Sequence, residues 1–179
     1  MRVYIRKPLI SDVKEYVDKN RASMETHRPW VFPATTPAGF RSYCEYMKLP
    51  RYEGFFICRK EDDAIVGVVN LSEIIRGALN GAFVGYWLYR GYEGRGYMTE
   101  GLSLVFDEAF GGLSLHRLEV NIQPANTASV ALANRLGLRK EGFSPKYLKI
   151  GGEWRDHERW ALLAEEWKGR EDRLDESPK

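Results

Sequence analysis

Apolar and polar residues change their spacing several times along the chain, and each change predicts a new element. Residues 2–7 alternate apolar with charged or polar side chains, a period of two that predicts a half-buried strand, and Pro8 ends it. From a cap at Ser11 or Asp12, apolar residues then recur three and four positions apart toward Met24. We therefore expect a strand followed by a helix.

A second helix and three strands are expected next. Thr36 and Pro37 have the residue types of a helix cap and a first helical position, and the helix is expected to end near Pro50. Aromatic and β-branched residues then gather in three runs separated by charged or glycine-containing turns, at residues 55–59, 65–75 and 82–89. These runs predict a meander of three antiparallel strands.

The second half of the chain alternates helices and strands. We expect a helix, a strand, a second helix and two closing strands, in that order, at residues 98–110, 116–123, 126–136, 139–150 and 153–163. Packed together, these elements give a mixed sheet with helices on both faces. We predict a single domain over residues 1–167 and a charged tail, 168–179, that is expected to be frayed.

Composition and charge exclude several classes of protein. The chain has 179 residues, of which 44% are hydrophobic and 29% charged, as in an ordinary globular domain. A net charge of +2 is too small for the basic surface of a nucleic-acid-binding protein. No apolar run reaches roughly 18 residues, the length of a membrane span, and residues 1–8 lack the apolar core of a signal peptide. We therefore expect a cytoplasmic protein with no direct nucleic-acid site and no membrane contact.

Residue types that bind metals are dispersed along the chain. Cys44 and Cys58 are the two cysteines, and neither forms a CxxC pair or neighbours a histidine. His27, His116 and His157 lack the short spacing by which two ligands reach the same ion. We expect reduced core thiols and no metal site.

A glycine-rich turn joins an expected strand to an expected helix within residues 86–100. Gly91, Gly94 and Gly96 let several backbone N–H groups point to the same side, and the helix adds the positive end of its dipole. Such a turn binds pyrophosphate, although a strand-to-helix turn also needs glycines for steric reasons alone. A Rossmann loop would belong to the first βα unit of a parallel sheet, and a Walker loop would continue as Gly-Lys-Ser/Thr. Neither pattern is present.

The residues around this turn resemble a known motif. The GNAT superfamily of acetyltransferases has a pyrophosphate motif whose second half is similar to Gly94-Arg95-Gly96-Tyr97-Met98-Thr99-Glu100. The second CoA-facing helix and the next strand of that family are similar to Asn126-Thr127-Ala128-Ser129 and to residues 136–142. Glu93 and Met98 depart from the motif, which usually has Gln or Arg and a small residue at these places. Because the family contacts are mainly backbone N–H groups, we expect binding to survive both departures.

Two further segments resemble one branch of that family. Residues 27–30 and 147–157 are similar to segments of RimJ-type N-terminal alanine acetyltransferases, so the resemblance to the RimJ/RimL branch spans almost the whole chain. It implies a GNAT fold of the mixed α+β class, with a mostly antiparallel central sheet of about seven strands and about four flanking helices. It also implies an enzyme that transfers an acetyl group from acetyl-CoA to the N-terminal amine (Ala or Ser) of a protein, with a ribosomal protein as the suggested substrate.

The resemblance also assigns residues to acetyl-CoA. In the family, the strand before the turn separates from its neighbour and pairs its backbone with pantetheine, and a backbone N–H near Leu88 would polarise the thioester carbonyl. The residues that the resemblance places at the cofactor are Tyr86, Trp87, Leu88, Gly94, Arg95, Gly96, Tyr97, Met98, Thr99, Asn126 and Ser129.

Two side chains are candidates for the base and the acid. Alternating apolar residues of the strand over 116–123 turn Glu119 to the opposite face, where it would act as the general base if that face lines the site. A half-exposed surface glutamate fits the same pattern. For the acid, many GNAT enzymes carry a tyrosine where this chain has Ala133, and the resemblance to RimL-like enzymes assigns Ser129 instead.

The acceptor is left more open. Trp30, Tyr147 and Trp154 are aromatic candidates for the acceptor channel, whereas Arg155 and Asp156 also fit a structural ion pair. A small amine, such as an amino acid, a polyamine or an antibiotic, is an alternative acceptor that a narrow acidic pocket would favour. The departures from the family pattern also leave open a catalytically silent acyl-CoA-binding module. The protein is expected to be a monomer or a homodimer.

Overall fold

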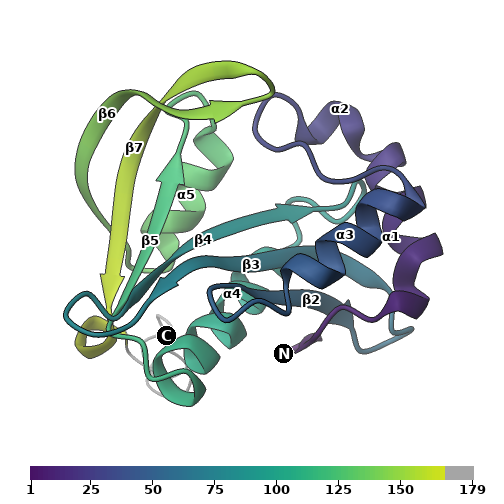
Figure 1. Cartoon of the computed structure of the whole chain (residues 1–179), viewed down its shortest axis with the longest axis horizontal. Coiled ribbons are helices and arrows are strands. Elements are labelled where there is room, and N and C mark those ends of the chain that lie inside the picture. Colours follow the sequence, from purple (N-terminus) through teal and green to yellow (C-terminus); the bar gives the residue numbers. More distant parts are fainter. Residues whose placement is uncertain (168–179) are drawn as a thin grey trace, which may run out of the picture.

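Seven strands form one sheet in the computed structural model, which describes residues 1–167 (Figure 1). The strands are β1 (Val3–Arg6), β2 (Glu53–Arg59), β3 (Ile65–Ile75), β4 (Gly81–Leu88), β5 (Arg117–Ile122), β6 (Arg139–Ile150) and β7 (Glu153–Leu163). Their order in the sheet is β1-β2-β3-β4-β5-β7-β6, and every neighbouring pair is antiparallel except β4 and β5. The mixed, mostly antiparallel sheet is confirmed, and the tail predicted for residues 168–179 lies outside the described residues.

Within residues 1–167, five α-helices accompany the strands, where the sequence predicts about four. They are α1 (Val13–Ala22), α2 (Met24–His27), α3 (Pro37–Tyr46), α4 (Tyr97–Asp107) and α5 (Thr127–Arg135). The additional helix is α2, a single turn that Ser23 separates from α1 because its backbone leaves the helical region (φ −101°, ψ 5°). No helix within residues 1–167 has both the length and the apolar character needed to cross a membrane.

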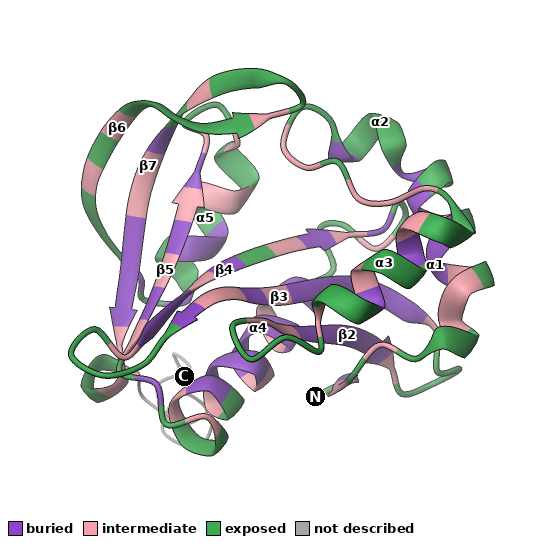
Figure 2. Ribbon diagram, in the orientation of Figure 1, coloured by how far each residue is buried: buried purple, intermediate pink, exposed green. Residues whose placement is uncertain are grey.

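The central strands bury both faces, because helices cover each side of the sheet (Figure 2). Alternate residues of β2 enter two separate apolar clusters, as the period of a strand requires. Phe55 and Ile57 lie in the cluster that includes residues of α4 and α5, whereas Phe56 and Cys58 lie in the cluster that includes residues of α1 and α3. Each fully buried side chain of this size contributes about 1.5–3 kcal/mol. The two clusters therefore hold β2, β3 and β4 firmly in place.

A gap opens in the sheet where β4 and β5 separate. Their parallel ladder covers three residue pairs and ends where Phe83 pairs with Glu119, although β4 stays paired with β3 as far as Leu88. Figure 1 shows the two strands diverging beyond this point. The N–H of Tyr89 donates to β3 (3.0 Å to the Val66 oxygen), so by alternation the backbone groups of Leu88 face the gap.

Candidate functional site

A cavity of about 760 Å³ lies beside the end of β4. Its wall combines that strand end, the glycine-rich turn, the first turn of α4 and one face of α5. The predicted cofactor residues that line it are Tyr86, Trp87, Leu88, Gly94, Gly96, Met98, Thr99, Asn126 and Ser129. Arg95 and Tyr97 do not: the Tyr97 side chain is buried in the core, and the Arg95 carbonyl accepts a hydrogen bond from Arg2 (2.6 Å). The cavity thus gathers most of the predicted cofactor residues.

The glycine-rich turn has the backbone conformation of an anion-binding turn. Gly94 and Gly96 have φ angles of 69° and 81°, in the left-handed region where a residue with a Cβ is strained. Gly96 is the N-cap of α4 and has no side chain to accept hydrogen bonds from the first turn of the helix. A helix N-terminus of this kind attracts a negatively charged group. The turn therefore fits a pyrophosphate.

The acidic residues near the turn are engaged by the protein itself. Glu93, one of the departures from the motif, lines the cavity, but its Oε2 accepts a hydrogen bond from the N–H of Gly91 at 2.7 Å. Glu100 receives hydrogen bonds from the backbone and the guanidinium of Arg2 (2.5–2.8 Å). Burial raises the pKa of Glu100, but these bonds and the charge of Arg2 lower it overall. Arg2 thus offsets the charge of Glu100 beside the phosphate site, whereas the partner of Glu93 is a neutral backbone N–H.

One face of α5 forms the wall opposite α4. Ala128, Ala131, Leu132 and Arg135 line the cavity, and their spacing of three and four residues places them on one side of the helix. Arg135 approaches the hydroxyl of Thr99 with its Nη1 (3.5 Å) and adds a positive charge near the N-terminus of α4. Sequence reasoning missed Arg135, although the spacing of these four residues was a signal for it.

A hydrogen bond from His27 fixes the end of β4. Its Nε2 lies 2.8 Å from the carbonyl oxygen of Leu88, and the side chain is 4% exposed. A carbonyl only accepts hydrogen bonds, so Nε2 carries the proton. Burial lowers the pKa of His27, which keeps the ring neutral. The Leu88 N–H faces the gap, where its predicted role at the thioester carbonyl stays a prediction.

A second cavity of about 440 Å³ adjoins the first. Five residues line both: Trp30, Val31, Tyr86, Asn126 and Ser129. Asn126 caps α5, because its Oδ1 accepts from the N–H of Ser129 (3.2 Å). Burial raises the pKa of Tyr86, and a hydrogen bond with Ser129 opposes this shift. Ser129, the predicted acid, therefore lies at the boundary where a group in one cavity can reach a group in the other.

The aromatic residues predicted for the acceptor separate into two groups. Trp30 and Tyr147 line the second cavity. Trp154 is 60% exposed and lines neither cavity. The suggested ion pair of Arg155 with Asp156 is not the one observed, because Arg155 pairs with Glu153 (2.6 Å). The structure therefore brings two of the three predicted aromatic residues together.

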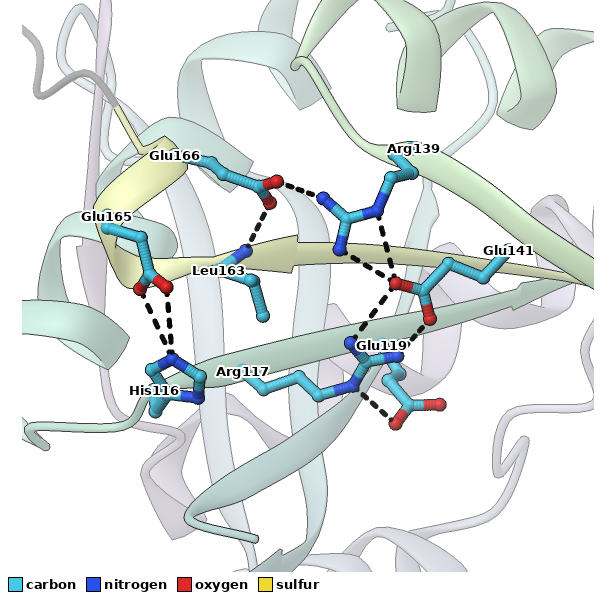
Figure 3. A network of polar contacts seen from close by, with 8 residues as sticks. All are labelled: His116, Arg117, Glu119, Arg139, Glu141, Leu163, Glu165 and Glu166. Atoms are coloured by element: carbon cyan, nitrogen blue, oxygen red, sulfur yellow. Dashed lines mark hydrogen bonds and ion pairs between the residues drawn. The ribbon is translucent and has the colours of Figure 1, made fainter.

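Glu119, the predicted base, lies in an ionic network at the edge of the gap (Figure 3). Its Oε1 accepts a hydrogen bond from Nε of Arg117 at 2.9 Å. Arg117 also pairs with Glu141, which receives a further bond from Arg139 (2.8 Å), and these arginines lower the pKa of Glu141 to about 2. Glu119 lines neither cavity, whereas Asn121, on the same strand face, lines the second. The role of Glu119 stays a prediction that its position does not support.

Polar residues that the sequence did not single out also line the second cavity. They are Ser72, Glu73, Asn121, Gln123 and His157. They come from β3, from β5 and the residue after it, and from β7, so no local motif could have revealed them. Within residues 1–167, no group of three or more His, Cys, Asp or Glu side chains is placed to hold a metal ion.

Known proteins resemble this chain in sequence and in fold. A family model described as acetyltransferase (GNAT) domain matches residues 2–139. The chain is 42% identical over 121 residues to a probable N-acetyltransferase, YjcK, of Bacillus subtilis, covering 68% of this chain and 67% of that protein. It is 30% identical over 161 residues to the ribosomal protein uS5-alanine N-acetyltransferase of Escherichia coli, covering 86% and 81% of the two chains. Mycobacterium smegmatis RimJ in complex with CoA-disulfide has a similar structure, with a TM-score of 0.88 and 29% identity over 97% of this chain and 88% of that one.

Proposed function

The chain belongs to the GNAT family of acetyltransferases, and on that premise we propose that its acceptor is the N-terminal amine of a protein that begins with Ala or Ser. It is an N-acetyltransferase, and acetyl-CoA is its acetyl donor. We take a ribosomal protein as the acceptor, because the relative from E. coli is named for alanine acetylation of ribosomal protein uS5. An acceptor of this kind places the enzyme in the cytoplasm.

The meeting of two cavities is the observation that carries the proposal. Acetyl transfer needs a thioester and an amine to meet from different directions. The first cavity offers the glycine-rich turn and Arg135 for the diphosphate and the unpaired edge of β4 for an extended pantetheine arm. The second adjoins it at Tyr86 and Ser129 and leaves room for the amine. Holding both reactants at this boundary supplies roughly 7–11 kcal/mol of the barrier reduction.

The chemistry of the second cavity supports a peptide acceptor over a polyamine. Several unpaired carboxylates would suit a molecule with several positive charges. Among the described residues that line this cavity, Glu73 carries the one carboxylate, and it already pairs with Arg51 and accepts from the Tyr52 hydroxyl (2.7 Å). Trp30 and Tyr147 supply apolar surface. This lining suits a small first side chain and a single amine.

The residues of the site have separate tasks in the reaction. Bound acetyl-CoA supplies an activated acetyl group. In the proposed reaction the N–H of Leu88 donates to the carbonyl oxygen as negative charge develops on it, and the hydrogen bond from His27 to the Leu88 carbonyl supports this role by fixing the direction of the strand end. In the same reaction the hydroxyl of Ser129 gives a proton to the departing sulfur, and its position at the boundary of the two cavities supports this role.

A panel of acceptors tests the proposal. Purified protein with acetyl-CoA is given peptides that begin with Ala, Ser or Lys, the Ala peptide with a blocked N-terminus, and spermidine, and release of free thiol is followed. We expect turnover with free Ala and Ser peptides and none with the blocked peptide. Turnover with spermidine alone would refute the protein acceptor, and CoA binding without any turnover would indicate a silent module.

A further inference from the structure

An acceptor amine reaches the enzyme largely protonated, because an α-amino group has a pKa of about 7.7–8.0. A base for this proton must lie in the second cavity. Among the described residues that line it, four have titratable side chains: Glu73, Tyr86, Tyr147 and His157. Burial raises the pKa of Tyr86 above its ordinary value near 10, and a phenol hydroxyl is in general a poor base at neutral pH. Glu73 pairs with Arg51 and accepts from Tyr52. His157 is the group whose titration range suits a base.

The backbone fixes the tautomer of His157. Nδ1 lies 2.9 Å from the carbonyl oxygen of Arg155, which only accepts, so in the neutral ring Nδ1 carries the proton and Nε2 keeps its lone pair. The side chain is 3% exposed and lines the second cavity. Within residues 1–167, Nε2 has no hydrogen-bond partner, and unlike Nδ1 of His27 it is not sealed off inside the protein. A proton-accepting atom is therefore available to the cavity.

The groups around His157 keep it neutral. Burial lowers the pKa of His157, and the hydrogen bond to the Arg155 carbonyl and the negative charge of Asp156 oppose this shift without reversing it. Asp156 also accepts a hydrogen bond from the N–H of Lys146 (2.7 Å), and Arg155 pairs with Glu153. From β6, the ring of Tyr147 packs at 6.3 Å and 63° to the imidazole, and from β3 the paired carboxylate of Glu73 lines the same cavity.

We propose, building on the acetyl transfer described above, that His157 is the general base for the acceptor amine, in place of Glu119. Nε2 of His157 takes one proton from the ammonium group, and the imidazolium later releases it to water. The lone pair thus freed on nitrogen forms the C–N bond to the acetyl carbon. As the C–S bond breaks, a second proton passes from nitrogen to the sulfur through Ser129, and the amide keeps the third.

The test compares two variants of His157 with a matched variant of another histidine. His116 is exposed, pairs with Glu165 (3.2 Å) and lines neither cavity, so His116→Gln serves as the control. We expect His157→Gln and His157→Ala to lower kcat for an Ala peptide by about 100-fold or more, the usual contribution of a general base. The Kd for CoA, measured by calorimetry, should stay within about twofold of the wild type in all three variants.

Two readouts separate a base from a structural histidine. The kcat of the wild type should rise with pH through an ionisation below the usual histidine pKa of about 6.5, and this limb should be lost in His157→Gln. Added imidazole should restore part of the activity of His157→Ala, because it fills the vacated space with the same base. A persistent acidic limb together with no rescue by imidazole would overturn the proposal, even if kcat falls.

The test of His157 as the base remains possible even if the proposed peptide acceptor is wrong. If the wild type acetylates spermidine and no peptide, the peptide proposal fails and the variants are measured with spermidine. If no probe turns over, nitrogen-15 NMR of labelled histidines still reads the tautomer of His157 in the folded protein. A proton on Nε2 at neutral pH would overturn the assignment, and a proton on Nδ1 would support it.

Discussion

Replacing Gly94 with alanine tests the phosphate-binding turn without removing any side chain. The φ angle of Gly94 is 69°, and a Cβ built there meets no atom within 4 Å, so the change adds backbone strain without a clash. Left-handed backbone costs a residue with a Cβ about 1–2 kcal/mol. If the turn relaxes by that amount away from the conformation that binds phosphate, the Kd for CoA rises roughly 5- to 30-fold.

Gly77 provides the matched control for this change. Its φ angle is 82°, and a Cβ there also meets nothing within 4 Å. It lies in the turn between β3 and β4 and lines neither cavity. Gly77→Ala should lower the Tm by about 2–4 °C for each kcal/mol of strain and leave the Kd for CoA unchanged. Similar backbone strain at the two glycines should therefore weaken CoA binding in Gly94→Ala and not in Gly77→Ala.

Calorimetric titration with CoA and kinetics with acetyl-pantetheine complete the comparison. Acetyl-pantetheine carries the thioester but no diphosphate, so Gly94→Ala should leave its KM unchanged while raising the KM for acetyl-CoA. If Gly94→Ala binds CoA as tightly as Gly77→Ala, or weakens both donors equally, the turn does not bind the diphosphate and the reasoning fails.

Three further changes have defined outcomes. Ser129→Ala should lower kcat more than the KM for acetyl-CoA, and an unchanged kcat would remove Ser129 from the mechanism. Glu119→Gln should change kcat by no more than about threefold, since its carboxylate is held by Arg117; a loss near the 100-fold typical of a base would instead restore Glu119 to that role. Because the arginines hold the pKa of Glu141 at about 2, below its usual 4.5, its contribution to stability is present above pH 4.5 and is lost as the pH falls toward 2. The difference in Tm between wild type and Glu141→Gln should therefore shrink over that range in thermal melts.

Local sequence signals placed most elements to within a few residues. Thr36 caps α3 as predicted, with its Oγ1 accepting from the N–H of Gly39 at 3.1 Å, and Asn126 caps α5 in the same way. The glycine-rich turn is one continuous segment, so its strand, turn and helix could be predicted together. Helix caps and turns depend on residues within four positions of one another, so they can be predicted from the sequence.

Whether the predicted base, Glu119, lines a cavity could not be predicted from neighbouring residues in the sequence. Alternation along β5 correctly assigns Glu119 and Asn121 to the same face of the strand, opposite the buried Val120. Which of the two lines a cavity depends on where β5 leaves β4. Glu119 pairs with Phe83 in the last rung of that ladder, whereas Asn121 lies beyond it and lines the second cavity. The end of a ladder is set by tertiary packing, which periodicity does not contain.

The separation of β4 from β5 also explains how a residue of β7, the proposed base His157, comes to line the second cavity. β5 remains paired with β7 along its whole length, to the rung of Ile122 with Glu158, so β7 follows β5 away from β4. His157 comes one residue beyond that rung, beside the gap, and the carbonyl of Arg155 on the same strand sets its tautomer. The same divergence thus leaves the N–H of Leu88 facing the gap on one side and brings His157 to the wall of the second cavity on the other. We therefore expect a substitution that extends the β4–β5 ladder to impair both proposed roles together, even though it alters neither residue.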